Sequence, residues 1–214
     1  MYLVELNEMI ENGENDKVEF KRKFSSPEKI AKEMIAFANS KGGKILFGID
    51  DDKTIIGVES EKGELELIST AAKFYCEPEI EFTTEIMLIK NKDVVVVNIE
   101  ESNMKPHRLI TDEQVENEIK VYIRLNDKSI MASKETIKIL KNSNDNSPPL
   151  QIFIGDIEKA LFDFLNANEK ITVKGFKRLV NISERRASRT LVNLVQAKVI
   201  RHHYFGNEDY FTLV

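Results

Sequence analysis

The sequence contains a single cysteine, Cys76, which excludes an internal disulfide and a zinc site built from cysteine thiolates. It contains only three histidines. Two of them, His202 and His203, are adjacent on an expected strand, so their side chains point to opposite faces and cannot bind one ion together. Cys76 follows Phe74 and Tyr75 on an expected helix, where a cysteine is more often a core residue than a nucleophile. The sequence thus predicts no histidine- or cysteine-based site.

Long apolar runs are also missing. No stretch reaches the roughly eighteen apolar residues of a membrane-spanning helix, so we expect no membrane association. The N-terminal residues lack a basic segment followed by an apolar one, which argues against a signal peptide. We therefore expect a cytoplasmic protein.

The phosphate-binding pattern G-x-x-x-x-G-K-[ST] is absent. Gly42 and Gly43 do not replace it, because they follow an expected helix and precede an expected strand. Phosphate loops need the reverse order, in which helix N–H groups meet the phosphate. We expect no ATP site and no bound cofactor.

Charge is distributed unevenly along the chain. The formal net charge is −5, but residues 151–214 contain ten Lys and Arg against seven Asp and Glu, which leaves +3 there and −8 elsewhere. Binding to nucleic acid depends on the local field, so the C-terminal part is the better candidate. Ordinary scatter of charges would give the same difference.

A break in composition divides the chain. Residues 141–149 contain no apolar side chain before two prolines and are rich in turn formers. Such a segment cannot offset the entropy of ordering by burial. We therefore predict a first domain at 1–142, a linker at 143–150 and a second domain at 151–214.

Helix and strand patterns alternate in the first domain. Ser26 and Pro27 begin an expected helix, and Gly42 ends it. The other expected elements are strands at 44–49 and 54–58, a helix at 64–76, a hairpin of strands at 79–89 and 93–100, and a strand at 118–125. This order predicts an α+β domain with a mixed or mainly antiparallel sheet.

The second domain shows three helical patterns and a hairpin. The helices begin near Asp156, Thr172 and Ser183, and strands follow at 199–205 and 209–213. A short turn joins the second and third helices. Three helices and a terminal hairpin in this order predict a winged helix-turn-helix.

The third of these helices is the expected recognition helix. Its expected exposed positions hold Arg185, Arg186, Ser188 and Arg189, and arginine suits both phosphate and guanine contacts. Arg201 and the two neighbouring histidines are expected at the hairpin tip, beside a nucleic-acid backbone. The alternative is a solvated helix face on a module that mediates protein contacts or dimerisation.

Three groups of motifs stand out in the first domain. The first is Glu14-x4-Glu19-Phe-Lys21. The second is Ala36-Phe-Ala-Asn39, followed by Gly42-Gly43, Gly48-Ile-Asp50-Asp51 and Ile56-Gly57. The third is Lys105-Pro106, Tyr122-Ile-Arg124 and Met131-Ala-Ser133.

In this combination, the first domain resembles the AlbA_2 domain of the Schlafen family, over about residues 10–135. The resemblance implies a DNA-binding domain of bacterial and archaeal regulators, often ahead of a winged helix.

Some vertebrate Schlafen proteins cleave RNA with a divalent metal held by two glutamates and an aspartate. By motif, the catalytic residues would here be Glu14, Glu19 and Asp51. The metal ligands would be Glu14, Glu19 and either Asp50 or Asp51, with Mg²⁺ or Mn²⁺. The structural alternative is that the aspartates simply favour a turn.

We therefore predict a nucleic-acid-binding protein, a transcriptional regulator that binds double-stranded DNA, acting as a homodimer as winged-helix proteins usually do. Candidate phosphate contacts in the first domain are Lys21, Arg22, Lys23, Lys105 and Arg124. Arg124 is equally open to a role as a structural ion-pair partner. The main alternative function is a Schlafen-like, metal-dependent endoribonuclease acting on structured RNA. The third is an interaction module that does not bind nucleic acid.

Overall fold

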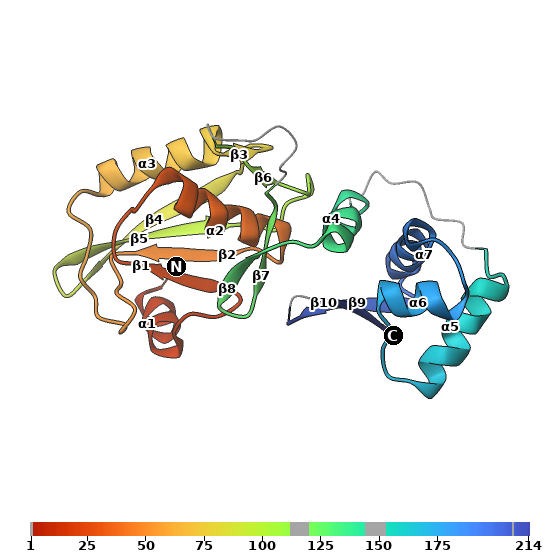
Figure 1. Cartoon of the computed structure of the whole chain (residues 1–214). Helices are drawn as coiled ribbons and strands as arrows, with labels where there is room; N and C mark the ends of the chain where they lie inside the picture. The colour runs from red at the N-terminus through yellow and green to blue at the C-terminus, as the bar shows by residue number, and fades with distance from the viewer. Residues whose placement is uncertain (1, 112–119, 144–152, 207) are drawn as a thin grey trace. The chain divides into compact units, whose positions relative to one another are not determined.

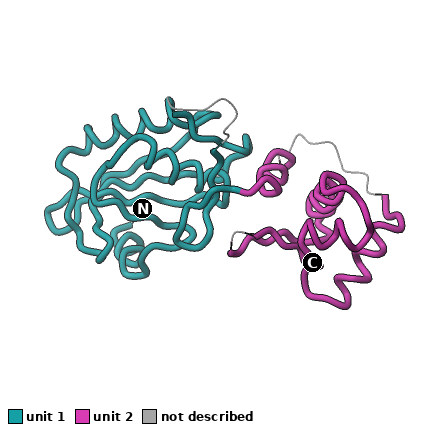
Figure 2. Tube along the Cα trace, viewed as in Figure 1, with its two compact units in different colours: residues 1–132 teal, residues 133–214 magenta. Residues whose placement is uncertain are grey.

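The computed structural model describes residues 2–111, 120–143, 153–206 and 208–214. The chain divides into two compact units, Met1–Ala132 and Ser133–Val214, shown in teal and magenta in Figure 2. None of the helices within the described residues is long and apolar enough to cross a membrane.

A four-stranded sheet forms the centre of the first unit. Its strands lie in the order β1 (Val18–Lys21), β2 (Gly43–Phe47), β5 (Lys92–Ile99) and β4 (Phe82–Ile89). β1 and β2 are parallel, and the other two pairs are antiparallel. The predicted α+β unit with a mixed sheet is therefore confirmed.

Helices cover both faces of this sheet (Figure 1). α2 (Pro27–Asn39) and α3 (Glu61–Phe74) pack on one face, and α1 (Leu3–Asn12) packs on the other. Side chains along β5 alternate between the two cores: Val95 and Val97 face α2 and α3, whereas Val94 and Val96 face α1. This period of two explains why a run of four valines forms a central strand.

The helix α1 has no counterpart in the sequence analysis. Its two fully or nearly fully buried residues are Leu6 and Ile10, which lie one turn apart on the face toward the sheet. Two apolar positions among mostly polar neighbours are a weak periodic signal, and for that reason the helix is hard to predict from sequence.

The strand predicted at 54–58 is wrong. Within this segment only Ile55 forms a β-bridge, and its partner is Ile49. The next two residues both donate to one carbonyl oxygen. The N–H groups of Ile56 and Gly57 both donate to the carbonyl of Gly48, at 2.8 and 2.9 Å. Gly57 has a φ of 80°, a left-handed value that a strand does not accommodate. The segment is therefore a tight loop.

The predicted hairpin is confirmed as β4 and β5, joined by a turn at Lys90 and Asn91, both of which have positive φ. Short strands complete the unit: β3 (Cys76–Glu77) pairs with β6 (Arg108–Leu109), and β7 (Tyr122–Leu125) pairs with β8 (Lys128–Met131).

Cys76 lies on β3 and not on the helix predicted for it, but it is buried as expected. Burial raises the pKa of its thiol to about 12, which disfavours the reactive thiolate form.

The second unit contains α4 (Lys134–Lys141), α5 (Asp156–Ala167), α6 (Val173–Leu179), α7 (Glu184–Gln196), β9 (Ile200–Phe205) and β10 (Glu208–Leu213). The three predicted helices and the hairpin correspond to α5, α6, α7, β9 and β10. As predicted, the hydroxyl groups of Thr172 and Ser183 cap α6 and α7. One apolar core, which includes Leu161, Phe176 and Phe211, joins these elements.

The helix α4 was not predicted, and the sequence analysis placed its residues in the first domain. In the structure it groups with the second unit, because it packs against α7. The predicted linker begins at 143, and its residues 144–150 lie outside the described part of the chain.

Candidate nucleic-acid interface

The side chain of Arg124 lies inside the first unit, with only 1% of its surface exposed. Its Nη2 is 2.8 Å from Glu19 Oε2, and its Nη1 is 3.4 Å from Glu33 Oε2. The guanidinium also donates to the carbonyls of Asn15 and Val18. It lies 4.8 Å from the centre of the Phe37 ring.

These contacts decide between the two roles that the sequence left open for Arg124. A guanidinium buried to this extent, with two carboxylates and two carbonyls as partners, is an internal ion-pair centre that no phosphate reaches. Arg124 from the Tyr-Ile-Arg motif thus holds Glu19 from the Glu-Phe-Lys motif, across about a hundred residues of sequence.

The other four candidate phosphate contacts of the first unit differ in accessibility. Lys21 pairs with Glu19, and Lys105, whose side chain is 9% exposed, pairs with Glu101 and donates to the carbonyl of Ser40. Arg22 is 64% exposed and lies 3.2 Å from Asp50. Lys23 is exposed. Of these candidates, Arg22 and Lys23, just after β1, present their charges mainly to solvent.

Asn39 of the Ala-Phe-Ala-Asn motif is 3% exposed and makes three hydrogen bonds. Its amide donates to the carbonyls of His107 and Tyr122, both at 2.9 Å, and its oxygen accepts from the His107 N–H at 2.8 Å. The side chain therefore fastens the end of α2 to two later segments. Its role in the motif is structural, since every polar atom is satisfied internally.

Gly42 and Gly43 follow the last turn of α2 and lead into β2, in the helix-to-strand order that the sequence predicted. A Cβ atom at Gly43 would lie 2.4 Å from the Phe37 ring, and one at Gly42 would lie 2.6 Å from the carbonyl of Ile99. Close approach of neighbouring groups therefore explains both glycines.

The carboxylates proposed for a metal site lie near one another, and those of Glu14, Glu19 and Asp50 already have protein partners. Glu14 accepts a hydrogen bond from the Phe20 N–H at 2.8 Å. Both oxygens of Glu19 have cationic partners, and Asp50 pairs with Arg22. Within the described residues no group of three or more Asp, Glu, His or Cys side chains is arranged to hold a metal ion. The donor set therefore does not fit a resident Mg²⁺ or Mn²⁺ in this arrangement.

The surroundings of Glu14 shift the pKa of its carboxyl group. Partial burial of its carboxyl group raises its pKa, the hydrogen bond from Phe20 opposes that rise, and the nearby charges of Glu19 and Asp51 add to it. An acid with a raised pKa in the folded state favours folding below its ordinary pKa of about 4.5 and loses that contribution as pH rises through the folded value.

We therefore expect Glu14→Gln to gain stability relative to the wild-type protein between pH 4 and pH 7, because the amide cannot ionise but still accepts from Phe20. Urea unfolding of both proteins at about pH 4 and pH 7 measures this difference. A variant whose disadvantage instead grew toward neutral pH would contradict the assignment.

In the second unit, the three predicted arginines of α7 are exposed. Arg185, Arg186 and Arg189 make no ion pair with another described residue. Ala187, Leu191 and Leu194 on the opposite side of the helix are buried in the core. The helix thus presents three guanidinium groups to solvent from its first two turns.

Ser188, which was expected on the same exposed face, is 2% exposed, and that expectation is wrong. Its hydroxyl accepts from Lys138 Nζ at 2.7 Å and donates to Glu135 at 3.1 Å. Both partners belong to α4, which covers this side of α7. The error follows directly from the failure to predict α4.

The hairpin places Arg201 opposite Thr212, near the base of β9 and away from the turn at Phe205 and Gly206. Arg201 is exposed, but it is not at the hairpin tip as the sequence analysis expected. His202 lies 2.6 Å from Asp209, and His203 stacks on Tyr210. The two histidines have different partners on β10, in keeping with their predicted opposite faces.

The exposed basic residues of α6 were not among the contacts predicted from the sequence. Lys174, Lys177 and Arg178 are all exposed, and Lys177 lies 3.5 Å from Glu184 at the start of α7. The sequence pattern Lys-x-x-Lys-Arg indicates this basic surface, because it puts three cations on the solvent side of a short helix.

The family model described as Schlafen, AlbA_2 matches residues 14–133. This match includes Glu14, Glu19, Asn39 and Arg124, all of which make internal hydrogen bonds in the first unit. The chain therefore belongs to the Schlafen AlbA_2 family.

Individual similarities are more distant. The chain is 34% identical over 125 residues to the uncharacterized ATP-binding protein UU034 of Ureaplasma parvum, a match that covers 47% of this chain and 35% of that protein. The chain thus spans about a third of the length of this relative.

Two solved structures are similar at low identity. The DIP2311 protein of Corynebacterium diphtheriae matches with a TM-score of 0.48 and 13% identity, over 82% of this chain and 32% of that one. The N-terminal domain of a Nitrosomonas europaea protein described as related to the ATP-dependent DNA helicase RecG matches with a TM-score of 0.43 and 18% identity. It covers 62% of this chain and 88% of that one. Neither similarity assigns a function at these scores.

Proposed function

We propose that this protein binds nucleic acid and acts in the cytoplasm as a transcriptional regulator, with double-stranded DNA as its partner. In this proposal α5, α6, α7 and the hairpin of β9 and β10 form a winged helix-turn-helix, and two copies bind paired half-sites. The observation that carries the proposal is the set of three exposed arginines in the first two turns of α7, which form no ion pair with a described residue.

The arrangement of α6 and α7 supports this role for α7. α6 ends at Leu179, α7 begins at Glu184, and Asn181 in the turn between them has a positive φ of 50°. In a helix-turn-helix the second helix enters the major groove with its N-terminal residues toward the base edges, and the first crosses the backbone. Those N-terminal positions of α7 are occupied by Arg185, Arg186 and Arg189. In this proposal the exposed cations of α6 contact the phosphates of the DNA backbone.

The first unit contributes a smaller basic surface in this proposal. Arg22 and Lys23 are its accessible cations, whereas Lys21, Lys105 and Arg124 are held by internal partners. The proposed phosphate contacts of this unit are therefore Arg22 and Lys23.

Fluorescence anisotropy with a labelled random DNA duplex tests the proposal. We expect Arg185→Ala and Arg189→Ala each to weaken binding about tenfold, because an arginine contact to a phosphate or guanine contributes roughly 1–3 kcal/mol. Each variant that removes a phosphate-binding arginine is expected to lower the slope of log affinity against log salt concentration by about one.

Lys159→Ala is the matched control, because Lys159 is an exposed cation on α5, outside the proposed groove-facing helix. We expect it to leave the affinity nearly unchanged. An equal loss in all three variants would indicate a general charge effect, and salt-independent binding would contradict the proposal.

The second candidate function is the metal-dependent endoribonuclease. Its support is that Glu19 and Asp51 both raise the pKa of Glu14, which puts three acidic groups in electrostatic contact. One oxygen of Glu14 and both oxygens of Glu19 are engaged by protein partners, however, so we rank this function second.

Incubation with total tRNA and Mn²⁺ distinguishes the two functions, and we expect the RNA to stay intact. Manganese-dependent fragments that disappear in Glu14→Gln would instead make the nuclease the leading function. Glu14 is the right position for this test, because Glu19 is 7% exposed and its replacement would also remove the partner of Arg124.

A further inference from the structure

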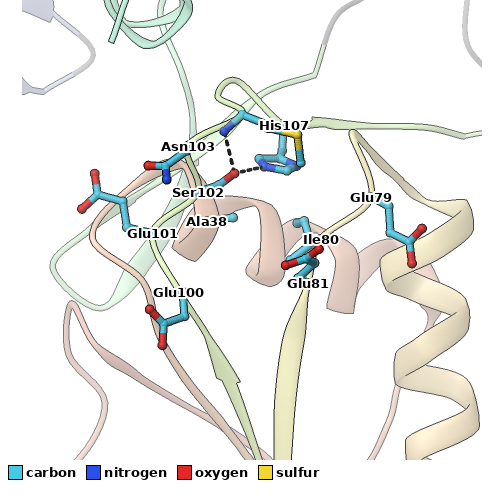
Figure 3. A pocket seen from close by; sticks show the side chains of 10 residues that line it. Ala38, Glu79, Ile80, Glu81, Glu100, Glu101, Ser102, Asn103 and His107 are labelled. Carbon is cyan, nitrogen blue, oxygen red and sulfur yellow. Dashed lines mark hydrogen bonds between the residues drawn. The ribbon is translucent and has the colours of Figure 1, made fainter. Parts of the chain in front are cut away.

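A cavity of about 390 Å³ lies in the first unit at the end of α2 (Figure 3), and the carboxylates of the Glu14 motif are not among its lining residues. Its walls include Ala38, Ile80, Ser102, Asn103 and His107. Neither the proposed DNA contacts nor the structural network around Arg124 uses this cavity.

Ser102 and His107 form a hydrogen-bonded pair in its wall. The Ser102 Oγ lies 2.6 Å from Nε2 of His107, and the other ring nitrogen, Nδ1, lies 2.7 Å from the carbonyl oxygen of Pro78. The N–H of Met104 donates to the same Ser102 oxygen at 3.0 Å, so the hydroxyl is held in place from two sides (Figure 3).

The partners fix the protonation of the ring. A carbonyl oxygen can only accept, so Nδ1 of His107 carries the proton and donates it to Pro78. Nε2 is then the free base and accepts the hydroxyl proton of Ser102. His107 is 1% exposed, and this burial, together with the nearby charge of Lys105, lowers its pKa and keeps the ring neutral near pH 7.

This is the geometry of an activated nucleophile: a hydroxyl within hydrogen-bond reach of a neutral imidazole that a third group orients. The Met104 N–H occupies an acceptor position of the Ser102 oxygen, which leaves the hydroxyl proton directed to Nε2 of His107. The adjoining cavity supplies room for a substrate beside the hydroxyl.

Four carboxylates surround the cavity: Glu79, Glu81, Glu100 and Glu101. Glu101 pairs with Lys105, and the other three are exposed and make no ion pair with a described residue. Such a rim repels phosphate and attracts cations. The cavity is therefore unsuited to nucleic acid and suited to a positively charged small molecule.

We propose that Ser102 and His107 are the nucleophile and general base of an esterase site that accepts esters whose acyl part carries an ammonium or guanidinium group. In the first step Ser102 Oγ forms a bond to the acyl carbon and its proton moves to Nε2 of His107. The bond between the acyl carbon and the alcohol oxygen then breaks, and the alcohol leaves with that proton. In the second step water gives a proton to Nε2 and adds to the acyl carbon, the bond to Ser102 Oγ breaks, and Oγ takes the proton from Nε2 as the carboxylic acid leaves. Asn103, which also borders the cavity, is the side chain available to donate to the developing oxyanion.

Labelling of the full-length protein with a biotinylated fluorophosphonate, followed by peptide mass spectrometry, tests the nucleophile. We expect modification at Ser102 of the folded wild-type protein and none in Ser102→Ala. His107→Gln is expected to lower the labelling rate at least about a hundredfold, because the base supplies 10²–10⁴ of such a reaction. Circular dichroism checks that this variant is folded.

Hydrolysis of 4-nitrophenyl 4-guanidinobenzoate and of 4-nitrophenyl acetate tests the substrate class. We expect the rate ratio of the cationic to the neutral ester to fall about tenfold in the Glu81→Gln, Glu100→Gln double variant, as the local field weakens. No label on the wild-type protein would overturn the proposed nucleophile, even if His107→Gln did not fold. An unchanged ratio would overturn the cationic substrate class. Neither result depends on DNA binding.

Discussion

Replacement of Arg124 by alanine is expected to lower the free energy of unfolding of the first unit by about 3–5 kcal/mol, the cost of removing one partner from a buried ion pair. Glu19, which is 7% exposed, and Glu33 would both keep their carboxylates in the interior after the guanidinium is gone. The carbonyl of Asn15 would lose its guanidinium donors, and that of Val18 would lose one donor but keep the N–H of Asn15. Such a loss is a large fraction of the roughly 5–15 kcal/mol by which folded proteins are typically stable.

Urea denaturation followed by circular dichroism measures this effect. Arg22→Ala is the matched control, because Arg22 is 64% exposed and its pair with Asp50 lies in water. We expect it to cost less than about 1 kcal/mol. The contrary outcome is an Arg124→Ala protein of wild-type stability with weakened DNA binding, which would make Arg124 a phosphate contact.

Replacement of Gly42 by alanine is the second large effect, with an expected loss of roughly 2–5 kcal/mol from backbone strain and overpacking together. Gly42 has a φ of 69°, and its Cβ would lie 2.6 Å from the Ile99 carbonyl oxygen and 2.9 Å from the Glu101 N–H nitrogen. Both neighbours are backbone atoms, one in the central strand β5 and one just after it. They cannot relieve the contact by a change of rotamer, as a flexible side chain could. The end of β5 or the end of α2 must therefore move.

Gly63→Ala is the control for Gly42, because it makes the same chemical change within the same unit. Gly63 lies in the first turn of α3, and a Cβ there would be 3.4 Å from the Ser60 hydroxyl, an ordinary contact. Alanine favours helix over glycine, so a small gain of up to about 1 kcal/mol is expected. Equal losses in the two variants, measured by the same urea experiment, would rule out crowding as the reason for Gly42.

The sequence predicted elements whose signal is local. The valine run of β5, the turn at Lys90 and Asn91, and the capping hydroxyl groups of Ser26 and Ser183 all show in neighbouring residues, and they are confirmed. The family motifs also identified the first unit before its fold was known.

The sequence did not resolve features that depend on distant contacts. The role of Arg124 depends on Glu19 and Glu33, which precede it by about a hundred residues. The burial of Ser188 depends on α4, and the loop at Ile56 depends on one carbonyl at Gly48. The pair of Ser102 and His107 is close in sequence, but the orienting carbonyl of Pro78 lies 29 positions away from His107. Hydrophobic periodicity reports burial, and it carries no information about which polar groups meet.

The packing of α4 on α7 has a practical consequence for dissecting the protein. A fragment that begins after Lys141, as the composition of the chain suggests, would leave α7 without Glu135 and Lys138 and would open the buried Ser188 hydroxyl to water. We therefore expect a stable C-terminal fragment to begin at Ser133, whose hydroxyl both caps α4 and donates to Asp209 of the hairpin. Exchange of this module between related proteins, in the laboratory or in evolution, would have to carry that helix along.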